Sequence, residues 1–137
     1  MTRLAPLAFL LTALPLAAFP LLASAQEVDC AKAEAQVELT FCAEQDWNAA
    51  DADLNAAYDV AISAMKGIDI NLDAPDQGAE KALRASQRAW ITFRDNTCAA
   101  EGWSFHGGSA EPMVIYQCRA RVSATRAEEL NNMAAGD

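Results

Sequence analysis

The sequence predicts a small all-α domain, an antiparallel three-helix bundle cross-linked by two disulfides. Apolar residues recur every three or four positions over residues 47–65, 83–98 and 115–130, which is the period of an amphipathic helix. Segments rich in Gly, Pro, Asn and Asp separate these three stretches. Four cysteines occur in a chain that begins like an exported protein, and small exported domains often contain disulfides. We expect residues 26–137 to form a single domain, because a chain of this length suits one core.

Residues 1–25 are typical of a cleaved signal peptide. Arg3 gives a positive start, residues 4–22 are apolar apart from one threonine, and residues 23–25 have the small-x-small form of a cleavage site. An uncleaved membrane anchor is the alternative, but the prolines within this stretch and the cleavage site favour removal. The first residue after the predicted cut is Gln26 and not a cysteine that could carry a lipid, so we expect no lipid anchor and no stable membrane attachment. The predicted location is the periplasm or outside the cell.

Acidic residues dominate the composition. The chain has 19 Asp and Glu against 10 Lys and Arg, a formal net charge of −9, which loss of Arg3 with the signal peptide would change to −10. Such a surface repels nucleic acid and anionic lipid and attracts basic proteins. The alternative is that the charge only keeps a small exported protein in solution.

The four cysteines predict two disulfides. Three pairings are possible, and we expect the local pairs Cys30–Cys42 and Cys98–Cys118, each closing a loop that stabilises the fold by about 3 kcal/mol. A metal site is the alternative, but no spacing is CxxC and His106 is the only histidine. We therefore expect no metal and no cofactor.

The first helix is predicted to begin at residues 35–37 and to end near Gly67. A continuous helix would place Cys30 and Cys42 about 18 Å apart, so the chain must fold back after Cys30 before the helix begins. Residues at intervals of three and four predict the buried face: Trp47, Ala50, Leu54, Tyr58, Ala61 and Met65.

The second helix is predicted to run from residue 78 or 79 to Cys98. A loop over residues 68–77 precedes it, and we expect the aliphatic side chains of that loop to pack against the bundle: Ile68, Ile70 and Leu72. One stripe of the helix contains Leu83, Gln87, Trp90, Arg94 and Cys98. Gln87 and Arg94 occupy positions that are normally apolar, so they need polar partners on a neighbouring helix.

Antiparallel packing of the first two helices predicts those partners. Facing residue numbers sum to about 145 when both helices rise equally. The expected pairs are Arg94 with Asp51, Trp90 with Leu54, and Gln87 with Asn55 or Tyr58. We interpret Arg94 and Asp51 as a buried structural pair, because breaking such a pair costs about 3–5 kcal/mol.

The third helix is predicted to follow Ser109, a good N-cap, with Glu111 and Pro112 in its first turn. It is expected to fray after Asn131. The predicted inner face contains Ile115, Cys118, Val122, Thr125 or Arg126, and Glu129 or Leu130.

The loop over residues 102–109 is the predicted partner-binding site. It carries Trp103, Phe105 and His106 between glycines, and it ends at Ser109 beside a helix N-terminus whose N–H groups could bind carboxylates of a partner. Alternatively, Trp103 and Phe105 cap the open end of the bundle. Exposure of the two rings distinguishes these interpretations.

No catalytic residue is predicted. His106 has no nucleophile near it in the sequence except Ser104 and Ser109, and the GxSxG, HExxH and phosphate-loop motifs are absent. Carboxylates are so numerous that pairs arise by chance. We therefore expect a protein that is not an enzyme.

Several motifs follow one another in a characteristic order. They are C-x(11)-C from Cys30, D-A-D-L-N-A-A-Y over residues 51–58, L-x(3)-Q-x-x-W-I-x-F-R-D-x-x-C over residues 83–98, G-G-S at residues 107–109 and the late Cys118. This order resembles the bacterial LprI-type lysozyme-inhibitor domain family, also described as DUF1311-like. The motif residues look architectural: Asp51, Leu54, Asn55, Tyr58, Gln87, Trp90, Arg94 and Asp95.

The resemblance implies a small exported helical domain with disulfides, and the namesake of the family is linked to lysozyme inhibition. The first hypothesis is therefore an envelope protein that binds and inhibits a lysozyme, a peptidoglycan-cleaving muramidase. Many lysozymes are strongly basic, and an aromatic loop could occlude their saccharide cleft. The second hypothesis is a non-catalytic periplasmic protein-binding or scaffold module with another partner.

Overall fold

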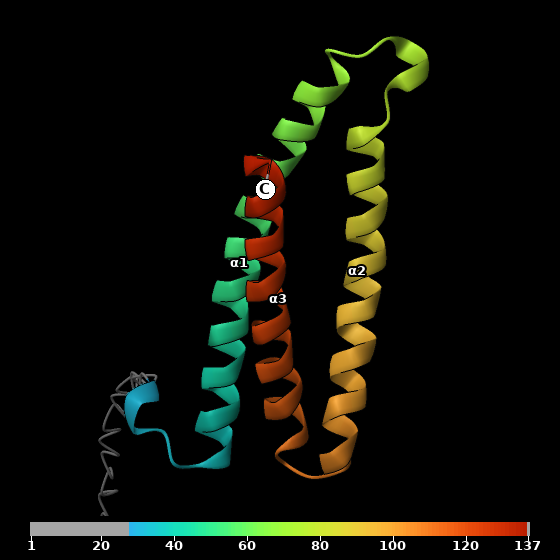
Figure 1. Cartoon of the computed structure of the whole chain (residues 1–137). Helices are drawn as coiled ribbons and strands as arrows, with labels where there is room; N and C mark the ends of the chain where they lie inside the picture. Colours follow the sequence, from blue (N-terminus) through green and yellow to red (C-terminus); the bar gives the residue numbers. More distant parts are fainter. Residues whose placement is uncertain (1–27, 137) are drawn as a thin grey trace, which may run out of the picture.

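The computed structural model describes residues 28–136, which fold into an up-down-up bundle of three long helices (Figure 1). The elements are η1 Cys30–Lys32, α1 Gln36–Asp69, η2 Ala74–Asp76, α2 Ala79–Gly102, η3 Trp103–Phe105 and α3 Glu111–Ala135, where η denotes a short 3-10 helix. The predicted all-α three-helix bundle is therefore confirmed, and residues 28–136 contain no strand. The predicted signal peptide lies outside the described residues.

The three helices differ in length, and this shapes the two ends of the bundle. α1 has 34 residues, whereas α3 has 25. α3 runs parallel to α1 and ends well before it, so the last turns of α1 have only α2 beside them (Figure 1). One end of the molecule is therefore a three-helix bundle and the other a two-helix hairpin.

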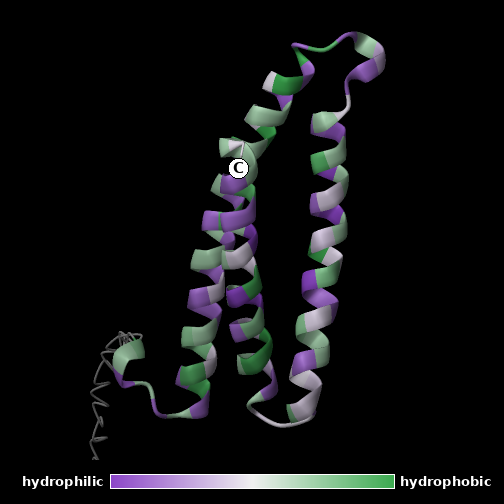
Figure 2. Ribbon diagram, viewed as in Figure 1, coloured by the Kyte–Doolittle hydropathy of each residue, from purple (hydrophilic) through white to green (hydrophobic). Residues whose placement is uncertain are grey.

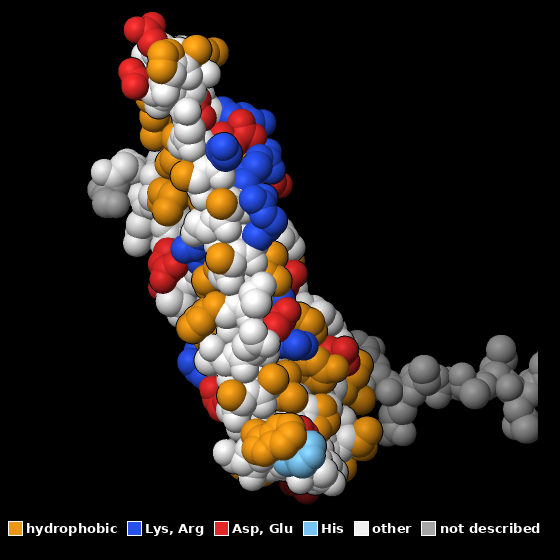
Figure 3. Space-filling view, turned by 90° about the vertical axis from the view of Figure 1, so that its right-hand side faces the viewer, with side chains coloured by type: hydrophobic (Ala, Val, Ile, Leu, Met, Phe, Trp, Pro, Cys, Tyr) orange, Lys and Arg blue, Asp and Glu red, His pale blue; other side chains and the backbone are white. Residues whose placement is uncertain are grey.

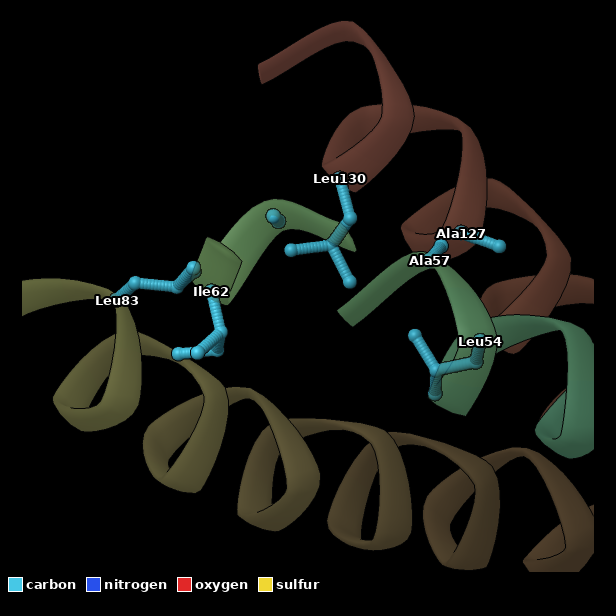
Figure 4. Close-up of a cluster of buried hydrophobic side chains, with 7 residues drawn as sticks. Leu54, Ala57, Ile62, Leu83, Ala127 and Leu130 are labelled. Atoms are coloured by element: carbon cyan, nitrogen blue, oxygen red, sulfur yellow. The ribbon is translucent and has the colours of Figure 1, made fainter. Parts of the chain in front are cut away.

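Small side chains occupy much of the contact between α1 and α3. Ala57, Ala61 and Ala127 are buried, and Ala57 lies beside Ala127 where the two helices meet (Figure 4). Larger side chains fill the remaining core, chiefly Leu54 and Leu130, which are 2% and 0% exposed. Each helix accordingly alternates hydrophobic and hydrophilic residues around its axis (Figure 2).

Both predicted disulfides are confirmed. Cys30 and Cys42, whose Cα atoms lie 5.6 Å apart, hold η1 against the first turns of α1. Cys98 and Cys118, with Cα atoms 5.4 Å apart, join α2 to α3 and are almost fully buried. α1 begins at Gln36, inside the predicted range, because the chain folds back after Cys30 as the first disulfide requires.

α2 begins where predicted, but a distant residue caps it. The backbone N–H groups of Gly78, Ala79 and Glu80 donate to the carboxylate of Asp69 at 2.8, 2.8 and 3.0 Å. These hydrogen bonds lower the pKa of Asp69, that from Glu80 being the largest cause. The last residue of α1 therefore supplies the cap that Gly78, without a side chain, cannot.

α2 extends four residues beyond its predicted end, to Gly102. A Cβ atom on Gly102 would lie 2.5 Å from Cγ1 of Ile115 on α3. Real Cβ atoms do not approach so closely, so the glycine lets the two helices meet where the chain turns between them.

Two predictions about α3 are wrong. Ser109 is not its N-cap, because the helix begins at Glu111 with Ala110 before it and no side-chain hydrogen bond at that cap. The helix also continues past Asn131 to Ala135. Of the inner-face alternatives, Arg126 and Leu130 are buried, whereas Thr125 and Glu129 are exposed; Ser123, which was not predicted, is fully buried.

The loop prediction for Ile68, Ile70 and Leu72 is also wrong. These side chains are 46%, 81% and 42% exposed rather than packed against the bundle. The reason is the short third helix, which ends before it reaches this part of the molecule (Figure 1).

Candidate functional site

The polar stripe of α2 is built into the core. Arg94 is 8% exposed and donates Nη1–H to Oδ1 of Asp51 at 2.9 Å, as the helix pairing predicted. Its Nε–H donates to Asp95 at 3.0 Å, and the rings of Trp47 and Trp90 flank the guanidinium. Asp51 keeps a 38% exposed side chain, so the pair lies at the edge of the core with its carboxylate partly in water.

The predicted partner of Gln87 is wrong. Asn55 donates instead to Asp51 on its own helix, and Gln87 accepts a hydrogen bond from Nε of Arg126 at 3.2 Å. Arg126 also donates to Glu129 at 2.8 Å. Pairing α1 with α2 alone could not find this contact, because Arg126 lies on α3. The contact between Gln87 and Arg126 could have been inferred from the position of Arg126 on the predicted inner face, since an inward arginine requires a hydrogen-bond acceptor.

Arginine and tryptophan side chains alternate along the bundle. Arg119 lies 4.8 Å from the ring centroid of Trp47, Arg94 lies between Trp47 and Trp90, and Arg126 lies 6.0 Å from Trp90. Cation–π contacts of this kind stabilise packing between helices. We therefore interpret the motif residues on α1 and α2 as architectural.

The loop over residues 102–109, here called the aromatic loop, projects from the three-helix end. Trp103 is 66% exposed, Phe105 is 49% exposed and the side chain of His106 is 56% exposed. Figure 3 shows the imidazole at the lower end of the molecule beside apolar side chains. The rings therefore face solvent rather than closing the end of the bundle.

The imidazole of His106 is held on one face and at one nitrogen. The ring of Trp103 stacks on it with centroids 3.9 Å apart and planes inclined by 14°. Nδ1 lies 3.1 Å from Oε1 of Glu111, whose other oxygen accepts the N–H of Gly107 at 2.8 Å. The hydrogen bond from Gly107, followed by that from His106, lowers the pKa of Glu111. The carboxylate at the start of α3 thus fixes the loop.

Both ends of the aromatic loop are attached to rigid elements. The Cys98–Cys118 disulfide joins α2 to α3 just before it, and Gly107 reverses the chain with φ of +76°, which only glycine adopts easily. Ser109 is exposed in the turn that follows. The predicted binding residues therefore share one projecting loop.

Other features of the described chain lie away from this loop. Hollows of about 460, 380 and 250 Å³ are lined by residues outside the loop. Within residues 28–136, no three His, Cys, Asp or Glu side chains gather in a way that could hold a metal ion. No helix in the same range is long and apolar enough to cross a membrane.

Comparison with known protein families identifies the family of this chain. A family model described as "Lysozyme inhibitor LprI" matches residues 29–130. The chain belongs to the LprI family. An uncharacterized protein of Rhizobium meliloti is 43% identical over 117 residues, which cover 83% of this chain and 84% of the relative. The uncharacterized protein YecT of Escherichia coli is 38% identical over 58 residues, 42% of this chain and 36% of YecT.

A solved structure places the LprI fold among known proteins. The crystal structure of a DUF1311 family protein of Pseudomonas putida matches with a TM-score of 0.63 at 25% sequence identity. The match covers 73% of this chain and 94% of the other. The predicted family resemblance is therefore confirmed.

Proposed function

We propose that this LprI-family protein is exported to the cell envelope, where it binds a lysozyme and inhibits it by inserting the aromatic loop into the saccharide cleft. The family description supports a role in lysozyme inhibition. The observation that carries the proposal is the projecting loop, which exposes Trp103 and Phe105 and in which Trp103 stacks on His106. Exposed aromatic side chains held on a rigid element are typical anchors of a protein interface.

Charge supports the same partner. The full chain has a formal charge of −9, and many lysozymes are strongly basic. Opposite net charges raise the rate of association, an effect that salt weakens. The charge therefore assists the encounter, whereas the loop supplies specificity.

The chemistry of His106 suits the active site of a glycosidase. Because Nδ1 faces the ionised carboxylate of Glu111, we assign the proton of the neutral ring to Nδ1, which leaves the lone pair on Nε2. A retaining lysozyme has a protonated carboxylic acid beside a second carboxylate. Nε2 of the neutral ring can accept a hydrogen bond from that acid.

The test is lysis of a peptidoglycan suspension by several types of lysozyme, with the purified mature protein added at low and at physiological salt. We expect inhibition that persists at physiological salt. Inhibition that disappears with moderate salt would indicate only a nonspecific attraction of opposite charges. No inhibition of any lysozyme type would refute the proposal.

Matched variants locate the contact. Trp103→Ala and His106→Ala should weaken inhibition by roughly tenfold or more, whereas Ile70→Ala at the opposite end should leave it unchanged. In a direct binding measurement, a lysozyme whose catalytic acid is replaced by Ala, which has no donor, should lose most of the discrimination between the parent and His106→Ala. If Ile70→Ala weakened inhibition as much as Trp103→Ala, binding through the aromatic loop would be contradicted.

The second candidate is a non-catalytic envelope protein-binding or scaffold module. The exposed rings of Trp103 and Phe105 suit a partner other than lysozyme equally well. This function predicts recovery of a specific envelope protein by the parent and not by Trp103→Ala, with no effect on lysis.

A further inference from the structure

A second surface carries charge of the opposite sign to most of the molecule. Lys81, Arg84 and Arg88 follow one another at intervals of three and four on α2, so they lie on one face of the helix. Lys66 joins them from α1, with its Nζ 3.9 Å from the carboxylate of Glu80. We call these four cationic side chains the basic ridge. Figure 3 shows Lys and Arg side chains gathered in a column over the upper half of the molecule.

The basic ridge has fewer carboxylate partners than cations, unlike the other Lys and Arg side chains of residues 28–136. Each Lys or Arg elsewhere in residues 28–136 forms an ion pair with a carboxylate. Within the ridge, Arg84 and Lys66 share Glu80, and Lys81 and Arg88 have no ion-pair partner in the described part of the chain. The ridge therefore has an excess of positive charge, although the chain as a whole is acidic.

The other carboxylate that lines the hollow beside the ridge does not offset this charge fully. Asp69 lines the same hollow, but its two oxygens accept three backbone N–H groups at the start of α2. The positive end of the α2 dipole further compensates it. Asp69 is therefore committed to the helix cap and is a poor partner for Lys81 or Arg88.

The ridge borders a concave surface. A hollow of about 380 Å³ is lined by Lys81, Arg84 and Arg88 together with Asp69, Gln77, Gly78 and Glu80. Two guanidinium groups and one ammonium group offer more donors than the two oxygens of one carboxylate can accept. A phosphate group has more oxygens, and its geometry matches the arginine fork.

We propose that the basic ridge is a binding site for a phosphate-bearing ligand, through Lys81, Arg84 and Arg88. The ligand is the phosphate of an anionic phospholipid headgroup or of a soluble phosphate compound, since both present the same chemistry. The site is at the end of α2 opposite the aromatic loop (Figure 1), and it does not depend on lysozyme binding. A ligand held there leaves the aromatic loop free.

The test compares two double variants that remove the same charge. Lys81→Gln with Arg88→Gln removes one lysine and one arginine without ion-pair partners. Lys32→Gln with Arg121→Gln removes one exposed lysine and one exposed arginine that pair with carboxylates. All four side chains lie on the surface, so both variants should fold, as checked by thermal melting.

Binding is measured to phosphatidylglycerol vesicles, to phosphatidylcholine vesicles and to soluble tripolyphosphate. We expect binding to phosphatidylglycerol or tripolyphosphate that is about tenfold weaker in the ridge variant and unchanged in the control variant. Binding to the vesicles alone assigns a lipid headgroup, and binding to tripolyphosphate assigns a soluble compound. Absence of binding to both, or equal loss in the two variants, would overturn the proposal.

Discussion

Replacement of Arg94 by alanine gives the most direct test of the architecture. The side chain is 8% exposed, and it forms two charged hydrogen bonds, at 2.9 Å to Asp51 and at 3.0 Å to Asp95. Each such bond contributes about 1.5–3 kcal/mol when buried. The two carboxylates are 38% and 41% exposed, so water replaces part of what the variant loses.

We therefore expect Arg94→Ala to lower the free energy of unfolding by about 2–4 kcal/mol, below the upper end for a fully buried pair. For a domain of this size, such a loss lowers the melting temperature by roughly 10–15 °C. The measurement is urea unfolding followed by far-UV circular dichroism, with both disulfides intact. The matched control is Arg121→Ala, whose exposed pair with Glu101 should change stability by less than about 0.5 kcal/mol.

Two outcomes would refute this reasoning. If Arg94→Ala unfolds like the parent, the guanidinium does not hold α1 and α2 in register. If Arg121→Ala costs as much as Arg94→Ala, the loss reflects net charge rather than the core position. A large loss for Arg94→Ala alone supports a structural role for the polar stripe.

Three further predictions concern single positions. Asp69→Asn should lower the melting temperature most at neutral pH. Because the pKa of Asp69 is lowered in the folded state, its stabilisation is full above its ordinary pKa of 3.8 and is lost as the pH falls through the folded-state pKa. The difference in melting temperature between the variant and the parent should therefore shrink in acid. Gly102→Ala should destabilise the fold by about 1–3 kcal/mol, because the new Cβ atom meets Ile115. Gly67→Ala, whose Cβ atom would have no described atom within 4 Å, should instead stabilise α1 by about 1 kcal/mol. Equal effects of the two variants in urea unfolding would contradict the packing at Gly102. Ser123→Ala should raise stability by about 1 kcal/mol, because the buried hydroxyl has no hydrogen-bond partner in the described chain. A loss of stability in the same assay would show that the hydroxyl forms a hydrogen bond.

Features that depend on short stretches of chain could be predicted. The helical period predicted all three helices, and the expectation of local cysteine pairs, one of three possible pairings, agrees with both disulfides. Equal rise along two antiparallel helices was enough to pair Arg94 with Asp51. In the aromatic loop, the sequence identified the residues but not the exposure of Trp103 or its stacking on His106.

The sequence by itself determined which residues form helices and most of the face of each helix that turns inward, because these depend on neighbours within a few turns. It favoured the two cysteine pairs that the structure contains, but left the other pairings possible. Only the tertiary structure decided that Gln87 meets Arg126, that Asp69 caps α2 and that Ile70 faces solvent. Each of these results depends on where another helix lies or ends. Periodicity along one segment does not contain that information, because burial and hydrogen bonding are properties of the assembled bundle.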